Sequence, residues 1–312
     1  MGRCSQHRPF SFPWNPYQLY SSKTENQMNR IGIIGLGRMG SAMAQRFVAE
    51  GNQVLSWTRS GRSVDGIGSA ADIPTLVATS DTLILSLLDD AAVANVLDQL
   101  LTCDLRGKQI VDTSTVVPDL LKDRIDGIHA KGGSAVDAPI SGGPELVLAG
   151  TCGIFIGGDA EAANRAEATL STISNRIFHV GPLGTGLVMK VINNGMIQAY
   201  FAGLGEMMPL AQRAGLPMET AMRILCGGPA GMPMIADRLP KVLGEDKSVG
   251  FAMSAVAKDN DVFQRVVASF GLDAPVLQIA GTQQNAVLAA GLAEEDPAVM
   301  VPFAYQQGKT VS

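Results

Sequence analysis

Uninterrupted apolar runs recur along the first half of the chain, and each is followed by a segment of helical length. The runs fall in residues 30–37, 52–59, 81–88, 108–115 and 134–140, and further strand-like segments follow in 151–159 and 175–182. Strands covered on both faces of a parallel sheet are apolar throughout, whereas half-exposed strands alternate. The pattern therefore predicts an α/β domain built on a buried parallel sheet.

The pattern changes at about residue 183. From there the chain reads as helices separated by Gly and Pro breaks, as in GLPMETAMRILCGGPAG at 215–231. We expect an α/β domain in 28–182 and an all-helical domain in 183–312. The first helix, near Gly186 to Arg213, is apolar on nearly every side, so it must pack in the domain core or against another subunit. This favours a homodimer or homotetramer.

Residues 1–27 differ in composition from everything that follows them. They contain several prolines and aromatic residues and no apolar stretch of the kind found in a secretory signal. Gln6 stands where N-myristoylation needs Ser or Thr. We interpret this segment as a disordered extension, or as residues added by an upstream start or a vector, and we expect Met28 to be the functional start.

Composition narrows the classes of function. Of the 312 residues, 46% are hydrophobic and 17% charged, and the net charge of −5 disfavours a nucleic-acid surface. No apolar run is long enough to span a membrane, because Lys190, Asn193 and Asn194 interrupt the longest candidate. The four cysteines form no CxxC pair, and there are only three histidines. We expect a reduced, cytoplasmic enzyme without a structural metal.

The stretch GLGRMG is the first motif that indicates a binding function. It supplies Gly35, Gly37 and Gly40 in GxGxxG spacing, directly after an apolar run and at the start of a helical segment. In this βαβ setting the glycines allow a tight turn, close approach of the backbone to a pyrophosphate, and close helix–strand packing. The sequence thus predicts a Rossmann dinucleotide-binding domain whose cofactor loop includes Leu36, Arg38 and Met39.

The end of the second predicted strand bears on the choice of cofactor. NAD-binding domains usually place Asp or Glu there, but this chain has Thr58, Arg59, Ser60 and Arg62. An acidic residue would repel the 2′-phosphate of NADP, whereas Arg59 can pair with it. NADP is therefore favoured, with NAD possible. The alternative is that Arg59 is a solvated residue at a strand end, which would leave the preference open.

Further motifs follow in a consistent order: DAPISGG at 137–143, AGT at 149–151, GTGLVMKVINN at 184–194 and AKD at 257–259. With them the chain resembles the β-hydroxyacid dehydrogenase family, which includes 3-hydroxyisobutyrate dehydrogenase and tartronate semialdehyde reductase. The resemblance covers about Met28 to the C-terminus and implies a C-terminal domain like that of 6-phosphogluconate dehydrogenase. It also implies an NAD(P)-dependent oxidoreductase that interconverts a small 3-hydroxy acid and its semialdehyde or 3-oxo acid.

The resemblance assigns roles to individual residues. It implies that Lys190 is the catalytic acid/base. It places the carboxylate-bearing substrate against five residues, namely Ser141, Gly142, Gly143, Asn194 and Lys258. It places the cofactor beside Leu87, Leu88, Thr115 and, again, Lys258. Asp259 is the structural neighbour of Lys258.

The spacing of Lys190 and Asn194 has a physical reading of its own. Residues four apart on a helix lie on one face, about 5–6 Å from each other, so both side chains can enter one cleft. Hydride transfer to a carbonyl builds negative charge on oxygen, and an ammonium group within reach can donate the proton. Such general acid catalysis typically raises the reaction rate about 100- to 10,000-fold. The alternative is a lysine whose stem packs on apolar neighbours while its amine reaches water.

One departure from the family pattern keeps other functions open. Leu88 and Asp89 stand where many members have Leu-Pro, a feature closer to the related imine reductases. The alternative is therefore an NADPH-dependent reductase of imines or neutral carbonyls, although such enzymes generally lack the lysine found here at 190. A third hypothesis is a non-catalytic NADP-binding protein. Met232, Met234 and Phe251 are candidates for shaping the substrate pocket.

Overall fold

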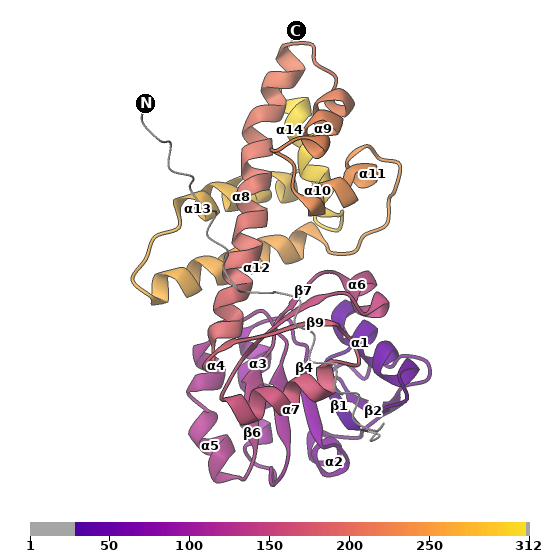
Figure 1. The fold of residues 1–312 in the computed structure, drawn as a ribbon, viewed down its shortest axis with the longest axis vertical. Helices are drawn as coiled ribbons and strands as arrows, with labels where there is room; N and C mark the ends of the chain where they lie inside the picture. Colours follow the sequence, from indigo (N-terminus) through magenta and orange to yellow (C-terminus); the bar gives the residue numbers. More distant parts are fainter. Residues whose placement is uncertain (1–28, 310–312) are drawn as a thin grey trace, which may run out of the picture.

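The computed structural model describes residues 29–309, so the predictions made for residues 1–27 lie outside it. Its first part is an α/β domain (Figure 1). The elements of this part are β1 (Arg30–Ile34), α1 (Arg38–Ala49), β2 (Gln53–Trp57), β3 (Gly68–Ser69), α2 (Ile73–Thr79), β4 (Thr82–Leu85), α3 (Asp90–Leu100), β5 (Gln109–Asp112), α4 (Asp119–Lys122), α5 (Ile125–Ala130), β6 (Ser134–Asp137), β7 (Ile140–Ser141), α6 (Pro144–Ala149), β8 (Gly153–Gly157), α7 (Ala160–Leu170) and β9 (Arg176–Gly181).

The strands form one sheet in the order β3-β2-β1-β4-β5-β6-β8-β7, with β9 paired to β8. Strands β1 to β6 are parallel, so the carboxyl ends of β1 and β4 meet at the centre of one edge. The chain leaves β1 toward β2 on one side, whereas β4 and β5 extend the sheet on the other. Such a switch point opens a crevice above the strand ends, where dinucleotides bind.

The apolar runs are explained by burial on both faces of the sheet. Ile33 packs in a cluster with Phe47 of α1, whereas its neighbour Ile34 joins the opposite cluster with Leu76 of α2. Successive side chains of a strand point to opposite faces, so each face needs its own apolar set. The predicted α/β fold class is confirmed.

The sheet is not purely parallel, contrary to the expectation. β8 runs antiparallel to both β6 and β7. A parallel connection needs a crossover of a dozen or more residues, and segment 142–152 between β7 and β8 is too short for one. The chain instead turns back through α6 and pairs in the opposite direction.

The second part is helical, and no strand occurs in the described residues after Gly181. Its core gathers Phe201, Met222, Ile235, Met253 and Val301. The elements are α8 (Thr185–Arg213), α9 (Met218–Gly227), α10 (Pro233–Asp237), α11 (Leu239–Val242), α12 (Met253–Ser269), α13 (Pro275–Ala289), the 3-10 turn η1 (Pro297–Val299) and α14 (Met300–Gln307).

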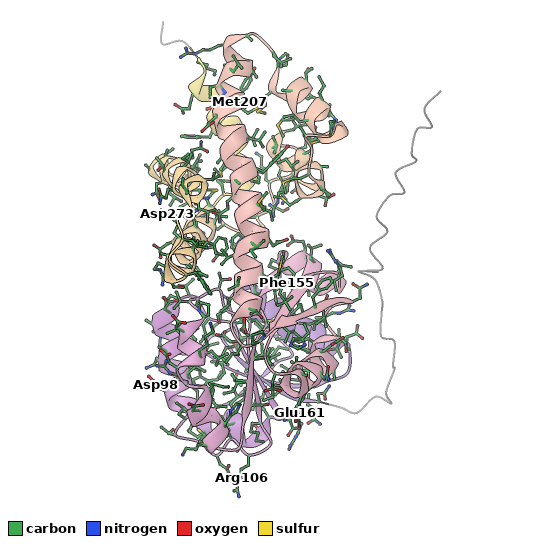
Figure 2. The ribbon with its side chains drawn as sticks, turned by 60° about the vertical axis from the view of Figure 1, so that its left-hand side comes forward. Asp98, Arg106, Phe155, Glu161, Met207 and Asp273 are labelled. Atoms are coloured by element: carbon green, nitrogen blue, oxygen red, sulfur yellow. The ribbon has the colours of Figure 1, made fainter. Side chains whose placement is uncertain are left out.

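Helix α8 joins the two parts. It starts beside the sheet and extends to the far end of the helical part, where Figure 2 labels Met207. Its first turn is held by a buried aspartate of β6. The two carboxylate oxygens of Asp137 accept hydrogen bonds from the backbone N–H of Gly184, at 2.6 Å, and of Leu187, at 2.7 Å. A carboxylate at a helix N-terminus satisfies free N–H groups and complements the helix dipole.

Among the described helices, none is long and apolar enough to span a membrane.

Candidate active site

A cavity of about 880 Å³ lies between the carboxyl edge of the sheet and the helical part. The loops that follow β1, β2, β4 and β5 line it from one side. Helix α12, the segment 250–252 and Lys190 of α8 line it from the other. This volume is at the upper end of the range for ligand sites, as a dinucleotide with a second small molecule would need.

The glycines of GLGRMG shape the cofactor end of this cavity. Gly35 has φ of 100°, and a Cβ there would overlap the carbonyl oxygen of Ser86. Gly37 begins α1 without a side-chain cap, and nothing lies within 4 Å of where its Cβ would be. A Cβ on Gly40 would overlap the carbonyl oxygen of Gly35. The free N–H groups of α1 and this open approach fit a pyrophosphate.

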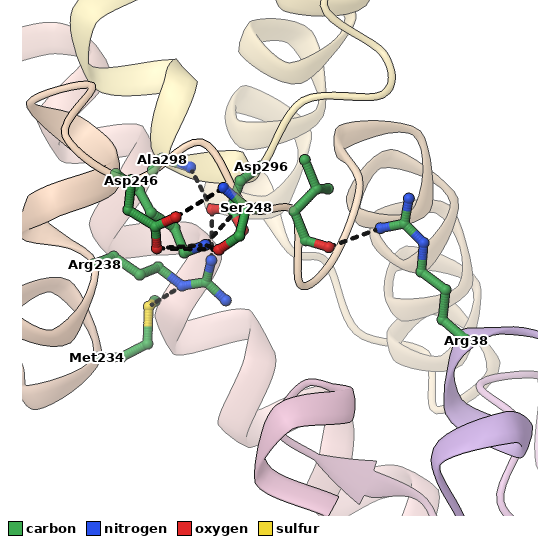
Figure 3. A network of polar contacts seen from close by, with 9 residues as sticks. Arg38, Met234, Arg238, Asp246, Ser248, Asp296 and Ala298 are labelled. Carbon is green, nitrogen blue, oxygen red and sulfur yellow. Dashed lines mark hydrogen bonds and ion pairs between the residues drawn. The ribbon is translucent and has the colours of Figure 1, made fainter. Parts of the chain in front are cut away.

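The other residues predicted for the cofactor loop also line the cavity, namely Leu36, Arg38 and Met39, whereas Gly40 lies behind them. Arg38 reaches across to the helical part and donates a hydrogen bond of 3.1 Å to the carbonyl oxygen of Val249 (Figure 3). The cofactor loop is thus in direct contact with both parts of the chain.

The end of β2 adds positive charge to the same cavity. Its predicted residues Thr58, Arg59, Ser60 and Arg62 all line the wall. The hydroxyl of Thr58 donates to the carbonyl oxygen of Arg62 at 3.0 Å, which closes the loop on itself. The cavity wall after β2 therefore carries two arginines and no acidic residue, a setting that suits a phosphate.

Lys190 lines the cavity from α8 and is only 6% exposed. Its Nζ donates a hydrogen bond of 2.6 Å to the carbonyl oxygen of Ile140. Burial lowers the pKa of this amine, Asp259 works against that shift, and Lys258 adds to it. Lys190 is therefore a buried amine at the cavity wall, with a pKa below that of a solvated lysine.

Lys258 and its neighbour Asp259 also line the cavity. The amine of Lys258 pairs with Asp259 at 2.9 Å and donates to the carbonyl oxygen of Thr115, also at 2.9 Å. Thr115, Leu87 and Leu88 complete the predicted cofactor wall after β4 and β5. These contacts connect α12 to the sheet directly beside Lys190.

Of the Ser-Gly-Gly segment only Gly142 lines the cavity, whereas the predicted substrate residues Ser141, Gly143 and Asn194 are not among the residues that line it. The amide nitrogen of Asn193 donates to the hydroxyl of Ser141 at 3.0 Å and to the side-chain oxygen of Asn194 at 2.9 Å. Ser141 and Asn194 are thus joined through a residue that the sequence analysis gave no role. Its only signal was its place between Lys190 and Asn194.

Two family models match almost all of the described chain. The NAD binding domain of 6-phosphogluconate dehydrogenase matches residues 30–181. The NAD-binding domain of NADP-dependent 3-hydroxyisobutyrate dehydrogenase matches residues 184–304.

The chain belongs to the β-hydroxyacid dehydrogenase family. It is therefore an oxidoreductase of the class that acts on CH–OH groups.

Curated relatives of this β-hydroxyacid dehydrogenase match along nearly their whole length. The mitochondrial 3-hydroxyisobutyrate dehydrogenase of Drosophila melanogaster is 28% identical over 92% of this chain and 93% of its own. The NAD-dependent L-serine dehydrogenase of Pseudomonas aeruginosa is 28% identical, and the match covers 88% of this chain and 97% of the relative. Among solved structures, Mycobacterium tuberculosis 3-hydroxyisobutyrate dehydrogenase with L-serine has a TM-score of 0.80 at 25% identity, over 89% of this chain and 99% of its own.

This β-hydroxyacid dehydrogenase also buries two aspartates that the sequence analysis did not single out. Asp112 and Asp137 stand opposite each other at the ends of β5 and β6. Burial raises the pKa of each to about 6, against the pull of their hydrogen bonds with backbone N–H groups. Asp137 heads the DAPISGG motif, which is the signal that could have drawn attention to it. Its bonds to α8 fix the helix that carries Lys190.

Metal-binding chemistry has little support in the described part of the chain. Residues 29–309 contain no group of three or more His, Cys, Asp or Glu side chains placed to hold a metal ion.

Proposed function

We propose that the chain is an NADP-dependent oxidoreductase that interconverts a small 3-hydroxy acid and its semialdehyde or 3-oxo acid. Residues 28–182 would bind the cofactor, and residues 183–312 would complete the substrate site. The observation that carries the proposal is the buried amine of Lys190, which lines the same cavity as the cofactor loop and is hydrogen-bonded to Ile140, next to the Ser-Gly-Gly segment.

The bound dinucleotide would supply or accept the hydride. The first turn of α1, from Gly37 onward, would hold its pyrophosphate. Arg59 and Arg62 would hold the 2′-phosphate of NADP, because the cavity wall formed by the end of β2 carries no acidic residue to repel it. NAD could still bind through the pyrophosphate contacts alone.

Lys190 would give a proton to the substrate oxygen during reduction and take it back during oxidation. Its hydrogen bond to Ile140 holds the amine at the cavity wall, in place for this transfer. A lysine whose pKa is lowered by burial exchanges its proton nearer to neutral pH than a solvated one does. Lys190 can thus act in both directions.

The substrate carboxylate would be held by the Ser141–Gly143 segment and Asn194. A glycine pair lets an anion approach backbone N–H groups closely. Asn193 would position Ser141 and Asn194 through its two hydrogen bonds.

A substrate panel tests this proposal. It should contain small semialdehydes and 3-hydroxy acids, including the 3-hydroxyisobutyrate and L-serine that the relatives' names give, each with both cofactors. The amide or ester of each acid is the matched control. We expect the acids to turn over and the neutral analogues to react at least about 10-fold more slowly, since one lost charged contact is worth roughly 1.5–3 kcal/mol. Equal rates for acid and amide would refute carboxylate binding.

The second candidate function is reduction of imines or of neutral carbonyls. It is favoured by the loop after β4, where Leu88 and Asp89 line the cavity in place of Leu-Pro. The presence of Lys190 argues against this second function, since such reductases generally lack this lysine. Turnover of cyclic imines or ketones in preference to the acids would establish this alternative.

We also propose that the enzyme works in the reducing cytoplasm. Cys103, Cys152 and Cys226 are all unpaired in the described structure. Cell fractionation with an antibody to the chain tests this location, and recovery in an oxidising compartment would refute it.

A further inference from the structure

We propose that Arg38 is a positioning residue for the substrate side of the cavity. It holds residues 249–251, here called the strap, and thereby links the cofactor loop to the wall that the substrate would contact. The strap belongs to the helical part, between α11 and α12, whereas Arg38 is the first residue of α1. This role rests on the proposed function, in which one cavity binds the cofactor and the substrate together. It gives Arg38 a task besides contact with the cofactor.

Arg38 makes the polar contact that holds the strap. Its guanidinium group donates a hydrogen bond of 3.1 Å to the carbonyl oxygen of Val249 (Figure 3). Among residues 29–309, no other hydrogen bond reaches residues 249–251, which lie in neither a helix nor a strand. A segment without backbone hydrogen bonds of its own keeps its position only through such outside contacts. The position of the strap therefore depends on Arg38.

Packing also brings the strap against the sheet part. Residues 244–248 are exposed, and the chain becomes half-buried at Val249, the residue that Arg38 contacts. A Cβ on Gly250 would lie 3.0 Å from a carboxylate oxygen of Glu145, in the first turn of α6. The strap thus contacts the first turns of both α1 and α6.

The strap forms part of the cavity wall. Gly250 and Phe251 line the cavity, and the chain then enters α12, which brings Lys258 to the same wall. The start of α12 is anchored within the helical part, because the backbone N–H of Met253 donates to the carbonyl oxygen of Glu295 at 2.9 Å. Loss of the contact with Arg38 would therefore displace Phe251 while α12 stays in place.

Arg38 can hold the strap and contact the cofactor at the same time. It stands at the start of α1, where a pyrophosphate would bind, and it lines the cavity. A guanidinium group has five N–H donors, and the bond to Val249 uses one of them. A cofactor phosphate that accepts from another donor would fix the side chain and make its contact with Val249 more stable. Cofactor binding should therefore order the strap before the substrate enters.

Steady-state kinetics of Arg38→Ala with the best acid substrate, at saturating NADPH, tests this role. We expect the substrate KM to rise about 5- to 10-fold, because a hydrogen bond from a charged donor is lost. The value of kcat should stay within about threefold, because Lys190 and α12 are unchanged. Arg38→Lys keeps a donor and should recover part of the substrate affinity, whereas a role of side-chain volume alone would give no recovery.

Arg165→Ala is the matched control for these kinetics. Arg165 also donates to a backbone carbonyl oxygen, that of Gly107 at 2.5 Å, but it does not line the cavity. Its substrate KM should equal that of the wild type. A wild-type substrate KM in Arg38→Ala, with only the dissociation constant of NADPH raised, would mean that Arg38 serves the cofactor alone and would overturn the proposal.

Trypsin cleavage after Lys247 gives a second readout, which needs no substrate. Lys247 is exposed and lies two residues before the strap. Cleavage in a folded protein follows the population of locally opened chain, so it should be about 5-fold faster in Arg38→Ala than in the wild type or Arg165→Ala. NADPH should slow it more in the wild type than in Arg38→Ala.

The two readouts separate this role from the proposed function. An enzyme that is inactive toward every acid, but whose cleavage after Lys247 depends on Arg38 and NADPH as expected, would refute the function and support the contact with the strap. Equal cleavage of the wild type and Arg38→Ala, with and without NADPH, would show that Arg38 does not hold the strap.

Discussion

Lys190 is a lysine that the fold keeps out of water. Burial disfavours its charged form and so lowers its pKa, the negative charge of Asp259 offsets part of this, and Lys258 adds to the lowering. A solvated lysine would hold its proton too firmly to act as a base near neutral pH. The surroundings of Lys190 thus give it the property that an acid/base in a reversible reaction needs.

Arg59 decides the cofactor in this account. Arg59→Asp should lower the ratio of kcat/KM with NADPH to kcat/KM with NADH by about 10- to 100-fold, because it replaces a phosphate contact of roughly 1.5–3 kcal/mol with a repulsive charge. Steady-state kinetics with both cofactors measures the ratio.

Arg223→Asp serves as the control for this change. Arg223 pairs with Glu219 on the exposed face of α9 and does not line the cavity. It should leave the cofactor ratio as in the wild type. An unchanged ratio in Arg59→Asp would mean that this residue is only a solvated arginine at a strand end.

Asp112 makes stability depend on pH. Its folded pKa, about 6, lies above the value of 3.8 expected in the unfolded chain, so the folded state keeps a proton that the unfolded chain releases. Unfolding therefore becomes easier as pH rises from about 4 to 6, the interval in which the unfolded chain has released this proton and the folded state still holds it. Asp112→Asn cannot titrate, so its free energy of unfolding should fall correspondingly less between pH 4.5 and 7.5.

Urea unfolding at several pH values measures this slope. Asp98 is the control, because its exposed ion pair with Arg124 lowers its pKa and places its titration below this window. Asp98→Asn should keep the wild-type slope. A wild-type slope in Asp112→Asn would contradict the raised pKa.

At the scale of elements, Gly40 and Gly37 of the loop after β1 should have different roles, the first in folding and the second in cofactor binding. A methyl group on Gly40 would overlap the carbonyl oxygen of Gly35, so α1 must shift away from the loop after β1. Gly40→Ala should cost about 1–3 kcal/mol in the free energy of unfolding without cofactor. At Gly37 φ is −66° and the Cβ position is open, so Gly37→Ala should fold normally.

Cofactor binding gives the second measurement for this pair. Gly37→Ala should weaken NADPH binding in a fluorescence titration, because its methyl group enters the space next to the first N–H groups of α1. Equal stability of the two alanine variants would show that Gly40 is not needed for helix–strand packing.

The elements that could be predicted from sequence are those whose signal is local. The strands on both sides of the central switch point are long apolar runs, and α8 is a long apolar helix, so each was expected close to its observed place. The direction of β8 could not be predicted, because it depends on which distant strand it meets. β3 has only two residues, too few to give a pattern.

The candidate site shows the same limit. The glycines and Arg59 follow from the fingerprint, and Lys190 and Asn194 from helical spacing and family resemblance. Asn193 was missed because its role depends on a contact with Ser141, which is 52 residues away in sequence. Asp112 and Asp137 were missed because only the register of β5 and β6 brings them together.

At the scale of the whole molecule, the cavity exists because two differently built parts face each other. Besides Arg38, an ion pair joins them: Arg265 of α12 and Asp90 of α3 lie 2.5 Å apart. Helix α8 holds both parts, since its first turn is bonded to Asp137 of the sheet and its later turns form the core of the helical part. Lys190 sits one turn beyond this anchor, which explains how the amine reaches a cavity whose cofactor wall belongs to the sheet.

The most direct test of this account is the rate of hydride transfer in Lys190→Met. Methionine keeps the length of the side chain without its charge, so packing around α8 should survive. We predict an unchanged dissociation constant for NADPH and a fall in the single-turnover rate of about 100- to 10,000-fold with the best acid substrate, as expected for loss of a general acid. Lys241→Met, outside the cavity, should match the wild type. A Lys190→Met rate within a few-fold of the wild type would contradict the central role of this amine.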